Sequence, residues 1–465
     1  MCSLTGVFNL ESLTYEVLYK GAFSQQHRGE DGAGVAATNG EKIFSKAKLG
    51  LVDPTVTEIW NEIEDNVGKN IIAAIAHTRY PTEGEVTAEN AQPFFGETKH
   101  GMIAYGHNGE LTNFNQLRKI FLDKGHTLTK SSDSEMFLHA YAGSEGKTTE
   151  EKLANAARLL KGAFSIVGIT KDTLFAVRDL HGFKPLSLAK LNGGYIIASE
   201  TAAFLDIEGA EWIEDILPGS IITITKEGIK KEKYEKETTW KPCIFETVYF
   251  ARPDSHIAGR NVHLVRKEYG KQLYAEAPIK ADIVIAIEDS GRSAAEGFAE
   301  ASGIRLERGF IRNHYMGRTF IRPTDILRNK GVNLKLAAVK EVIEGKRVVL
   351  IDDSIVRGNT AKSRVRLVIA AGAKEVYLYI TSPVLRYDCM YGIDFHKESM
   401  RATIMPNDKE FTELIKVNKL VHLSEQGMYE AIKRVPLDKR VQINYSEKEF
   451  CTGCFTGKYP VPKEQ

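Results

Sequence analysis

The stretch KRVVLIDDSIVRGNTAKS, residues 346–363, decides the fold of the part of the chain that contains it. An apolar run, Val348–Ile351, leads into Asp352 and Asp353 and then into a loop with Ser, Arg, Gly and Thr before helical sequence. A loop at a helix N-terminus offers backbone N–H groups and hydroxyls to an anion, and Gly358 lets the backbone approach closely. Ligands bind at the carboxyl ends of strands in open α/β sheets. We therefore expect a phosphate in the loop, with sugar hydroxyls or an indirectly held metal at the two acids.

Strands alternate with helices on both sides of this turn. The apolar run Ile283–Ile287 precedes helical Ser293–Ser302, and helical Thr360–Ala371 precedes the apolar run Val376–Ile380. Such alternation predicts a parallel sheet with right-handed crossovers.

The first half of the chain has a different texture, with short apolar runs bounded by Gly, Asn or Pro turns. Strands are expected at Leu4–Phe8, Gly34–Thr38, Ile71–Ala76, Met102–Tyr105, Phe164–Ile169, Thr173–Val177, Tyr195–Ala198 and Ile221–Thr225. Helical periodicity is present at Asn113–Lys124, Ser134–Ala142 and Glu150–Leu160. This pattern predicts an α+β or layered α/β unit. The charged segment KKEKYEKETTWKP, residues 230–242, indicates the approach to a domain boundary.

Composition excludes several classes of protein. The 465 residues predict two or three domains at roughly 150 residues each. A net charge of +1 gives no global reason to expect nucleic acid or a membrane as partner, and five cysteines exclude a small disulfide scaffold. No apolar run approaches the roughly 18 residues of a membrane helix, and MCSLTGVFNLES is not a secretory signal. We expect a soluble cytoplasmic protein.

Cys2 follows the initiator methionine. Removal of Met1 would leave Cys2 with a free α-amino group, so that nucleophile and base belong to one residue. The alternative is an incidental cysteine. Five motifs follow in order: QHRGEDGAG (26–34), HTRYPTEG (77–84), ENAQPF (89–94), YGHNGELTNF (105–114) and SSDSE (131–135).

Together these motifs resemble the glutaminase half of class II glutamine amidotransferases, an N-terminal-nucleophile fold. The resemblance implies that Arg79 pairs with the glutamine α-carboxylate and that Asp133 receives the α-ammonium. It also implies an oxyanion hole formed by Asn108 and the Gly109 N–H, in a site that Arg28 helps to shape.

Four other cysteines remain, namely Cys243, Cys389, Cys451 and Cys454, the last two within CTGC. Four thiols that include a CxxC suggest a metal site more than disulfides in a cytoplasmic protein. Spacing alone leaves open a structural zinc, an iron–sulfur cluster, a redox CxxC or scattered buried thiols.

The surrounding motifs PCIFETVYFARPDS (242–255), CMYGID (389–394) and CTGCFTGKYP (451–460) resemble the cluster-bearing branch of the amidophosphoribosyltransferases. That resemblance covers nearly the whole chain. It implies that the four cysteines hold a four-iron four-sulfur cluster with a structural role.

The stretch 346–363 resembles the phosphoribosyl-diphosphate (PRPP) motif of type I phosphoribosyltransferases. The resemblance implies that Asp352 and Asp353 hold the ribose 2′ and 3′ hydroxyls and, with Ser290, bind PRPP as its Mg²⁺ complex. The expected 5′-phosphate cradle comprises Ser354, Ile355, Val356, Arg357, Gly358, Asn359 and Thr360.

Two further stretches belong to the same expected site. IAIEDSGRSAAEG (285–297) is expected to bind the pyrophosphate group through Asp289, Ser290 and Gly291. RNHYMGRTFIRP (312–323) resembles the family's closing loop, in which Arg318 neutralises pyrophosphate and Tyr315 couples closure to the glutaminase.

The chain departs from the family pattern at four positions. Ser3 stands where Gly is usual after the nucleophile, Glu30 where Gln is common, Glu288 where Pro is typical and His314 where Arg is usual. Ser3 and Glu288 keep open an alternative, an ammonia-dependent phosphoribosyltransferase with a crippled glutaminase. A PRPP-binding regulator is the second alternative.

The sequence therefore predicts an α/β protein of two domains. Residues 2–238 form a four-layer αββα glutaminase, and residues 239–465 form a parallel-sheet phosphoribosyltransferase with a C-terminal cluster-binding tail. The implied reaction converts PRPP, glutamine and water to 5-phosphoribosylamine, pyrophosphate and glutamate, the first committed step of purine biosynthesis. The resemblance also implies purine nucleotides as feedback inhibitors and a homotetramer or homodimer. No nucleic acid or membrane partner is expected.

Overall fold

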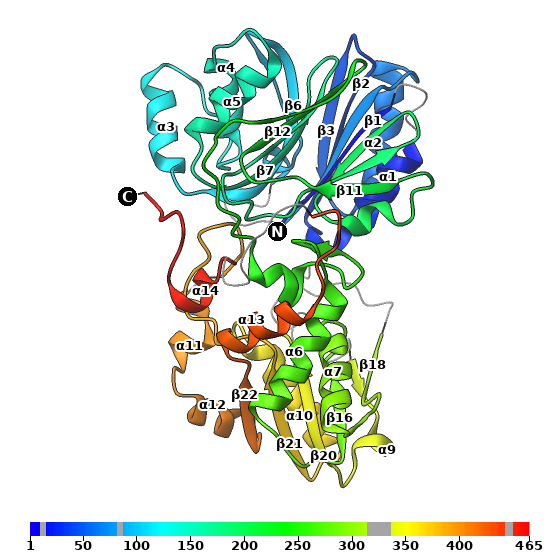
Figure 1. The fold of residues 1–465 in the computed structure, drawn as a ribbon, viewed down its shortest axis with the longest axis vertical. Helices are drawn as coiled ribbons and strands as arrows, with labels where there is room; N and C mark the ends of the chain where they lie inside the picture. Colours follow the sequence, from blue (N-terminus) through cyan, green and yellow to red (C-terminus); the bar gives the residue numbers. More distant parts are fainter. Residues whose placement is uncertain (10–14, 81–86, 314–335, 396, 442–449, 465) are drawn as a thin grey trace.

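The computed structural model describes residues 1–9, 15–80, 87–313, 336–395, 397–441 and 450–464. Two bodies are stacked along the long axis, and the N-terminus lies where they meet (Figure 1). The first body holds two antiparallel sheets and the second holds one parallel sheet.

Two sheets pack face to face in the first body. The seven-stranded sheet has the order β11 (Glu211–Asp215), β9 (Ser187–Leu191), β10 (Gly194–Ala198), β1 (Ser3–Asn9), β4 (Ala73–Arg79), β2 (Gly32–Thr38), β3 (Ile43–Leu49). The six-stranded sheet has the order β13 (Gly228–Lys233), β12 (Ser220–Thr225), β8 (Leu174–Arg178), β7 (Gly162–Ile169), β6 (Gly101–Leu111), β5 (Phe94–Thr98). Leu4 and Ile75 from one sheet meet Val167 and Ile222 from the other in a buried apolar layer. Period-two alternation sends these side chains inward.

Helices cover the two outer faces. Helices α1 (Tyr15–Phe23) and α2 (Val52–Val67) cover the seven-stranded sheet, while α3 (Phe114–Asp123), α4 (Glu135–Gly143) and α5 (Thr149–Leu159) cover the six-stranded sheet. Short 3-10 turns are η1 (Gln26–Arg28), η2 (Ala88–Asn90) and η3 (Thr201–Phe204). The predicted αββα layering is confirmed.

The second body is built on a parallel sheet with the order β17 (Arg305–Leu306), β16 (Ile283–Ala286), β20 (Arg347–Asp352), β21 (Glu375–Ile380), β22 (Lys419–His422). Helices α6 (Val262–Glu276), α7 (Arg292–Ser302) and α13 (Glu425–Arg434) cover one face. Helices α9 (Lys340–Ile343), α10 (Asn359–Ala370) and α12 (Asp408–Ile415) cover the other. The predicted parallel sheet is confirmed.

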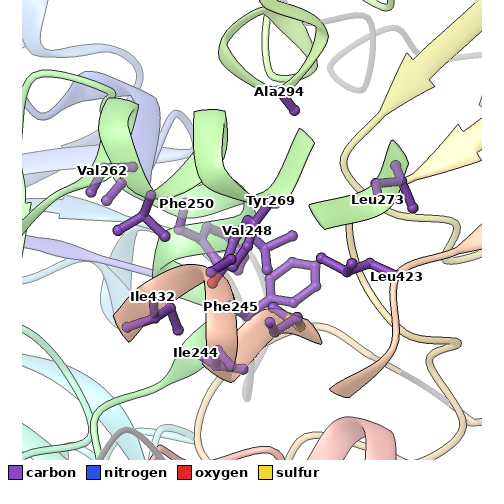
Figure 2. Packing of buried hydrophobic residues seen from close by; sticks show 14 of the residues in the cluster. Ile244, Phe245, Val248, Phe250, Val262, Tyr269, Leu273, Ala294, Leu423 and Ile432 are labelled. Atoms are coloured by element: carbon purple, nitrogen blue, oxygen red, sulfur yellow. The ribbon is translucent and has the colours of Figure 1, made fainter. Parts of the chain in front are cut away.

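The remaining elements of this body are small. They are two hairpins, β14 (His256–Ile257) with β15 (Arg260–Asn261) and β18 (Phe310–Arg312) with β19 (Leu336–Ala338), and the turns η4 (Glu246–Phe250), η6 (Lys397–Ser399), α11 (Arg401–Ile404) and α14 (Gly453–Thr456). Turn η4 is π-helical and is embedded in the core that Figure 2 shows, where Phe245, Val248 and Phe250 lie among residues of α6, including Tyr269.

Each strand and helix predicted from the sequence is present. Most ends shift by at most three residues, but the strand expected at Met102–Tyr105 extends to Leu111 in β6. Several elements were not predicted, among them the helices α1, α2, α6 and α13 and the strands β3, β5, β9 and β22. Helix α2 has Pro54 in its first turn, and β3 is an edge strand with half-buried lysines. The charged segment 230–242 begins inside the edge strand β13 and continues as a connection. The boundary at residue 238 stays a prediction. Within the described ranges, no helix is long and apolar enough to span a bilayer.

Candidate functional site

Cys2 lies directly before β1, beside the end of β4. Strand pairing opposes Ser3 to Thr78, so the next residue of β4, Arg79, lies opposite Cys2. The backbone N–H of Tyr80 donates to the Cys2 Sγ over 3.5 Å, and the Sγ lies 3.6 Å from the Tyr80 carbonyl. The antiparallel register thus places a thiol and a guanidinium at one edge of the sheet.

Ser3, which departs from the family pattern, is hydrogen-bonded away from the thiol. Its Oγ lies 2.7 Å from the Thr78 Oγ1, and both residues are buried. The extra side chain is therefore satisfied by the neighbouring strand.

The second sheet supplies Asn108 and Gly109 from β6. The Asn108 Nδ2 is buried and, among the described residues, has no hydrogen-bond partner. A buried donor without a partner costs free energy unless a ligand supplies the acceptor. Gly109 has a φ of +152°, and a Cβ at this position would lie 1.9 Å from the Ala163 carbonyl O. This backbone accepts glycine alone.

Arg79 and Asp133 lie on segments that end near this edge. Burial lowers the pKa of Arg79, which donates to the Thr87 carbonyl over 3.2 Å. The Asp133 Oδ2 accepts the Leu111 N–H over 2.8 Å at the end of β6. This bond ties Asp133, two residues before α4, to the strand that carries Asn108.

Arg28 lies behind the nucleophile rather than in the open site. Its side chain is fully buried, and its Nε donates to the Cys2 carbonyl over 3.0 Å. The guanidinium pairs with Glu200 and, through two bonds of 2.7 and 3.0 Å, with Glu246. Burial tends to lower the pKa of Arg28, but Glu246 and Glu200 outweigh burial and raise it. Arg28 therefore fixes the backbone of Cys2.

The predicted phosphate turn follows β20 as expected. Asp352 and Asp353 are buried at the carboxyl end of the strand, and the hydroxyls of Ser290 and Ser354 donate to Asp353. Gly358 has a φ of +83° and precedes the first residue of α10.

Within the turn, the side chains differ in exposure. Ile355 is buried in the core under the sheet, so it can contribute to a phosphate site only through its backbone. Arg357, Asn359 and Thr360 are exposed, and Val356 is half-buried. The Val356 carbonyl accepts the Arg401 N–H over 2.8 Å.

The predicted pyrophosphate turn lies next to these acids. A Cβ at Gly291 would lie 2.4 Å from the Ile351 carbonyl O, so glycine permits the close approach of this turn to β20. Asp289 forms an ion pair with Arg312. Tyr315, Arg318 and His314 lie outside the described residues, and their predicted roles stay predictions.

The buried acid pair supports a prediction that separates activity from stability. Burial, then the neighbouring Asp353, raises the pKa of Asp352. Above the ordinary pKa near 3.8, the Asp352 carboxyl loses its proton in the unfolded chain but keeps it in the folded chain. The free energy of unfolding therefore falls as the pH rises toward the pKa of Asp352 in the folded protein. Asp352→Asn should therefore raise the free energy of unfolding at pH 7. It should slow ammonia-dependent transfer about 10- to 100-fold, because asparagine cannot ionise when PRPP and Mg²⁺ bind and so cannot form the charged hydrogen bonds of a carboxylate.

Thermal unfolding between pH 5 and pH 8 and pyrophosphate release with ammonia measure the two effects. Asp282→Asn, at the opposite end of the sheet, is the control. Hydrogen bonds from Arg347 hold the pKa of Asp282 down at about 2. Asp282 therefore stabilises the folded protein above its ordinary pKa, and this contribution to the free energy of unfolding is lost as the pH falls. Asp282→Asn should not stabilise the protein. A less stable Asp352→Asn protein at pH 7 would contradict the assignment.

The four remaining cysteines converge where the two bodies meet. Cys243 and Cys451 face each other in a parallel bridge, and the Cys389 Sγ accepts the Tyr391 N–H over 3.4 Å. Burial, then the nearby thiols of the other three, raises the pKa of Cys454. Burial also raises the pKa of Cys243 to about 12. Within the described ranges, no three His, Cys, Asp or Glu side chains are arranged to hold a single metal ion.

Two buried features near these sites were missed from the sequence. Glu200 and Glu246 form ion pairs with Arg28. Glu246 lies within the motif 242–255, but nothing in the motif indicates that it pairs with Arg28. Lys184 is fully buried, and its Nζ donates to the Met1 Sδ over 2.7 Å. A single charged residue gives no signal of its partner, because the partner is remote in sequence.

The fold and the two sites define an N-terminal-nucleophile glutamine amidotransferase joined to a phosphoribosyltransferase. Residues 77–206 match the family model described as a glutamine amidotransferase domain. The chain is 39% identical over 462 residues to the amidophosphoribosyltransferase of Bacillus subtilis, covering 99% of this chain and 94% of the relative. It is 38% identical over 477 residues to that of Mycobacterium bovis, covering 100% and 87%. The chain belongs to the amidophosphoribosyltransferase family.

Solved structures agree with this assignment. The glutamine PRPP amidotransferase of B. subtilis complexed with ADP and GMP matches with a TM-score of 0.88 at 38% identity, covering 100% of this chain and 98% of that one. A structure described as the allosteric regulatory enzyme of purine biosynthesis matches with a TM-score of 0.90 at 38% identity, covering 100% and 97%.

Proposed function

We propose that this chain converts PRPP, glutamine and water to 5-phosphoribosylamine, pyrophosphate and glutamate, the first committed step of purine biosynthesis. The observation that carries the proposal is the buried Asn108 Nδ2, which has no partner among the residues that the structure describes and lies on the strand next to the Cys2 edge, in the same chain as the Asp352–Asp353 turn. Family membership supports it. The Ser3 hydroxyl is satisfied by Thr78, so Ser3 gives no reason to favour the crippled glutaminase.

The first half-reaction takes place at Cys2 once Met1 is removed. The Cys2 thiol transfers its proton to its own α-amino group, and the Sγ attacks the side-chain amide carbon of glutamine. Asn108 Nδ2 and the Gly109 N–H stabilise the tetrahedral oxyanion. The C–N bond breaks, ammonia leaves with the transferred proton, and water hydrolyses the thioester to glutamate. Arg79 and Asp133 hold the α-carboxylate and α-ammonium of glutamine.

The second half-reaction takes place at the β20 turn. Asp352 and Asp353 hold the ribose hydroxyls, and the loop before α10 holds the 5′-phosphate. Ammonia from the first site forms the new bond to C1 as the bond from C1 to the pyrophosphate oxygen breaks. Mg²⁺, bound with PRPP near Ser290 and the two acids, would neutralise the leaving pyrophosphate.

We further propose that Cys243, Cys389, Cys451 and Cys454 hold a four-iron four-sulfur cluster. Lys184 supports this assignment. Its ammonium is fully buried, and no carboxylate in the described part of the chain pairs with it, while its charge acts on Cys243, Cys389 and Cys451. A buried cation needs an anion nearby, and thiolates with a cluster supply one. The cluster would join the C-terminal segment to the rest of the body. Iron and sulfide analysis of anaerobically purified protein tests this, and a chain free of both would refute it.

The B. subtilis complex with ADP and GMP supports purine nucleotides as inhibitors of this chain as well. The proposed assembly is a homotetramer or homodimer, and the proposed compartment is the cytoplasm.

Glutamate release by anaerobically purified protein, with and without PRPP and Mg²⁺, tests the proposed function. We expect strong stimulation by PRPP, because the two sites serve one reaction. No release under either condition, from protein whose N-terminal Cys2 is confirmed by sequencing, would refute the glutaminase half.

A further inference from the structure

A buried line of charged groups begins at the nucleophile. The Cys2 carbonyl accepts the Arg28 Nε, and the guanidinium grips Glu246 through both carboxylate oxygens at 2.7 and 3.0 Å. Arg28 and Glu246 are both fully buried. Glu246 is the first residue of η4, in the body that carries the phosphate turn. The nucleophile of one body is therefore positioned by a carboxylate of the other.

The line continues from η4 toward the phosphate turn. Arg266 of α6 donates to the carbonyl of Thr247 and to that of Ala251, both over 2.8 Å, and so brackets the turn. Arg266 is itself buried. Ile351, the residue before Asp352, belongs to the same apolar core as Val248 of η4, and Val356 of the phosphate turn packs against that core. Arg266 thus holds the backbone of η4, and the shared core joins η4 to the strand and turn predicted to contact PRPP.

Turn η4 is well placed to transmit a displacement. Its apolar residues Val248 and Phe250 are packed in the core that Figure 2 shows, and the Thr247 hydroxyl lies 2.7 Å from the Tyr269 hydroxyl. A close-packed interior passes on small shifts rather than absorbing them. π-Helical turns are rare in proteins as a whole, and those that occur lie frequently at functional sites.

We propose that Glu246 and Arg266 are positioning residues that couple the PRPP turn to the Cys2 nucleophile through Arg28. Occupation of the turn shifts the core that Ile351 and Val356 share with η4, and η4, held by Arg266, carries the shift to Glu246 and the Cys2 backbone. The inference rests on the proposed function, because it assigns a route to stimulation of glutamate release by PRPP.

Glu246→Gln tests the coupling, because it keeps the shape of the side chain but removes its charge. We expect the ratio of glutamate release with PRPP to that without PRPP to fall about 3- to 30-fold. The change should appear in kcat, with the KM for glutamine nearly unchanged, since Glu246 acts on the Cys2 carbonyl through Arg28. Ammonia-dependent pyrophosphate release should stay near that of the wild type. Arg266→Lys should lower the ratio in the same direction.

A double variant shows whether Glu246 and Arg266 act through the same pathway of contacts. If they do, Glu246→Gln with Arg266→Lys should lose no more stimulation than the more affected single variant, whereas independent effects would multiply. Glu268→Gln, on the same helix α6 and paired with Lys271 and Arg434, is the matched control and should keep the wild-type ratio.

Three outcomes decide the matter. A wild-type chain without stimulation refutes the proposed function rather than the coupling. The coupling is overturned if PRPP stimulates the wild type and the stimulation ratio in Glu246→Gln is unchanged. It is also overturned if the losses of stimulation multiply in the double variant. If Glu246→Gln loses ammonia-dependent activity as well, Glu246→Asp decides, because it keeps the charge but its side chain is too short to reach Arg28 in the same way. A wild-type ratio of glutamate release with and without PRPP in Glu246→Asp overturns the proposal, and a lowered ratio supports it.

Discussion

Cys2→Ala should reduce glutamine-dependent formation of phosphoribosylamine by at least about 10³-fold, because no other group can form the thioester. Ammonia-dependent formation should stay near that of the wild type. Among the described residues, the Cys2 Sγ forms hydrogen bonds only with the backbone of Tyr80. The bond from Arg28 that positions Cys2 goes to the Cys2 carbonyl, which alanine retains. The substitution therefore removes chemistry and leaves the contact between the bodies intact.

Parallel assays with glutamine and with ammonium salts measure the two activities, and N-terminal sequencing verifies removal of Met1 in both proteins. The ammonia assay is the internal control for folding and for the PRPP site. Retained glutamine-dependent activity in Cys2→Ala would show that Cys2 is not the nucleophile and would restore the crippled glutaminase as the better description of the wild type. Loss of both activities would show that the Cys2 thiol has a structural role.

The sequence indicated the residues proposed to contact the substrates, but it did not indicate the residues that hold those side chains and backbones in position. Residues such as Asp352, Asp353 and Gly358 are recognisable because a phosphate turn needs fixed residue types within a few positions of one strand and one helix. Asn108 and Gly109 are recognisable for the same reason, since one short stretch of β6 supplies both.

The supporting groups follow from packing between distant segments. Arg28 is bonded to Glu246, 218 positions away, and Lys184 to Met1, 183 positions away. No local period or spacing encodes such pairs, because they form only once segments distant in the sequence have packed together. A buried charge signals that a partner is needed, but only the tertiary structure says which one.

Gly109→Ala should lower glutaminase activity by about 10²- to 10³-fold, the effect of losing an oxyanion-hole donor. The added Cβ would lie 1.9 Å from the Ala163 carbonyl O and 2.9 Å from the His107 Nε2, and the φ of +152° is strained for alanine. The strand must move away from β7, and Asn108 moves with it. Ammonia-dependent activity should persist, because the PRPP turn is in the other body.

Gly101→Ala is the matched control for this clash. Gly101 begins the same strand β6 with a φ of +98°, and a Cβ there has open space, with no atom within 4 Å. Both variants carry the backbone strain of about 1–3 kcal/mol, but only Gly109→Ala adds the clash beside the oxyanion hole. Thermal unfolding should therefore show a loss of stability in both, while glutamate release should fall sharply in Gly109→Ala alone. Equal losses of glutamate release would mean that strain in β6, rather than the close approach at Gly109, controls the site.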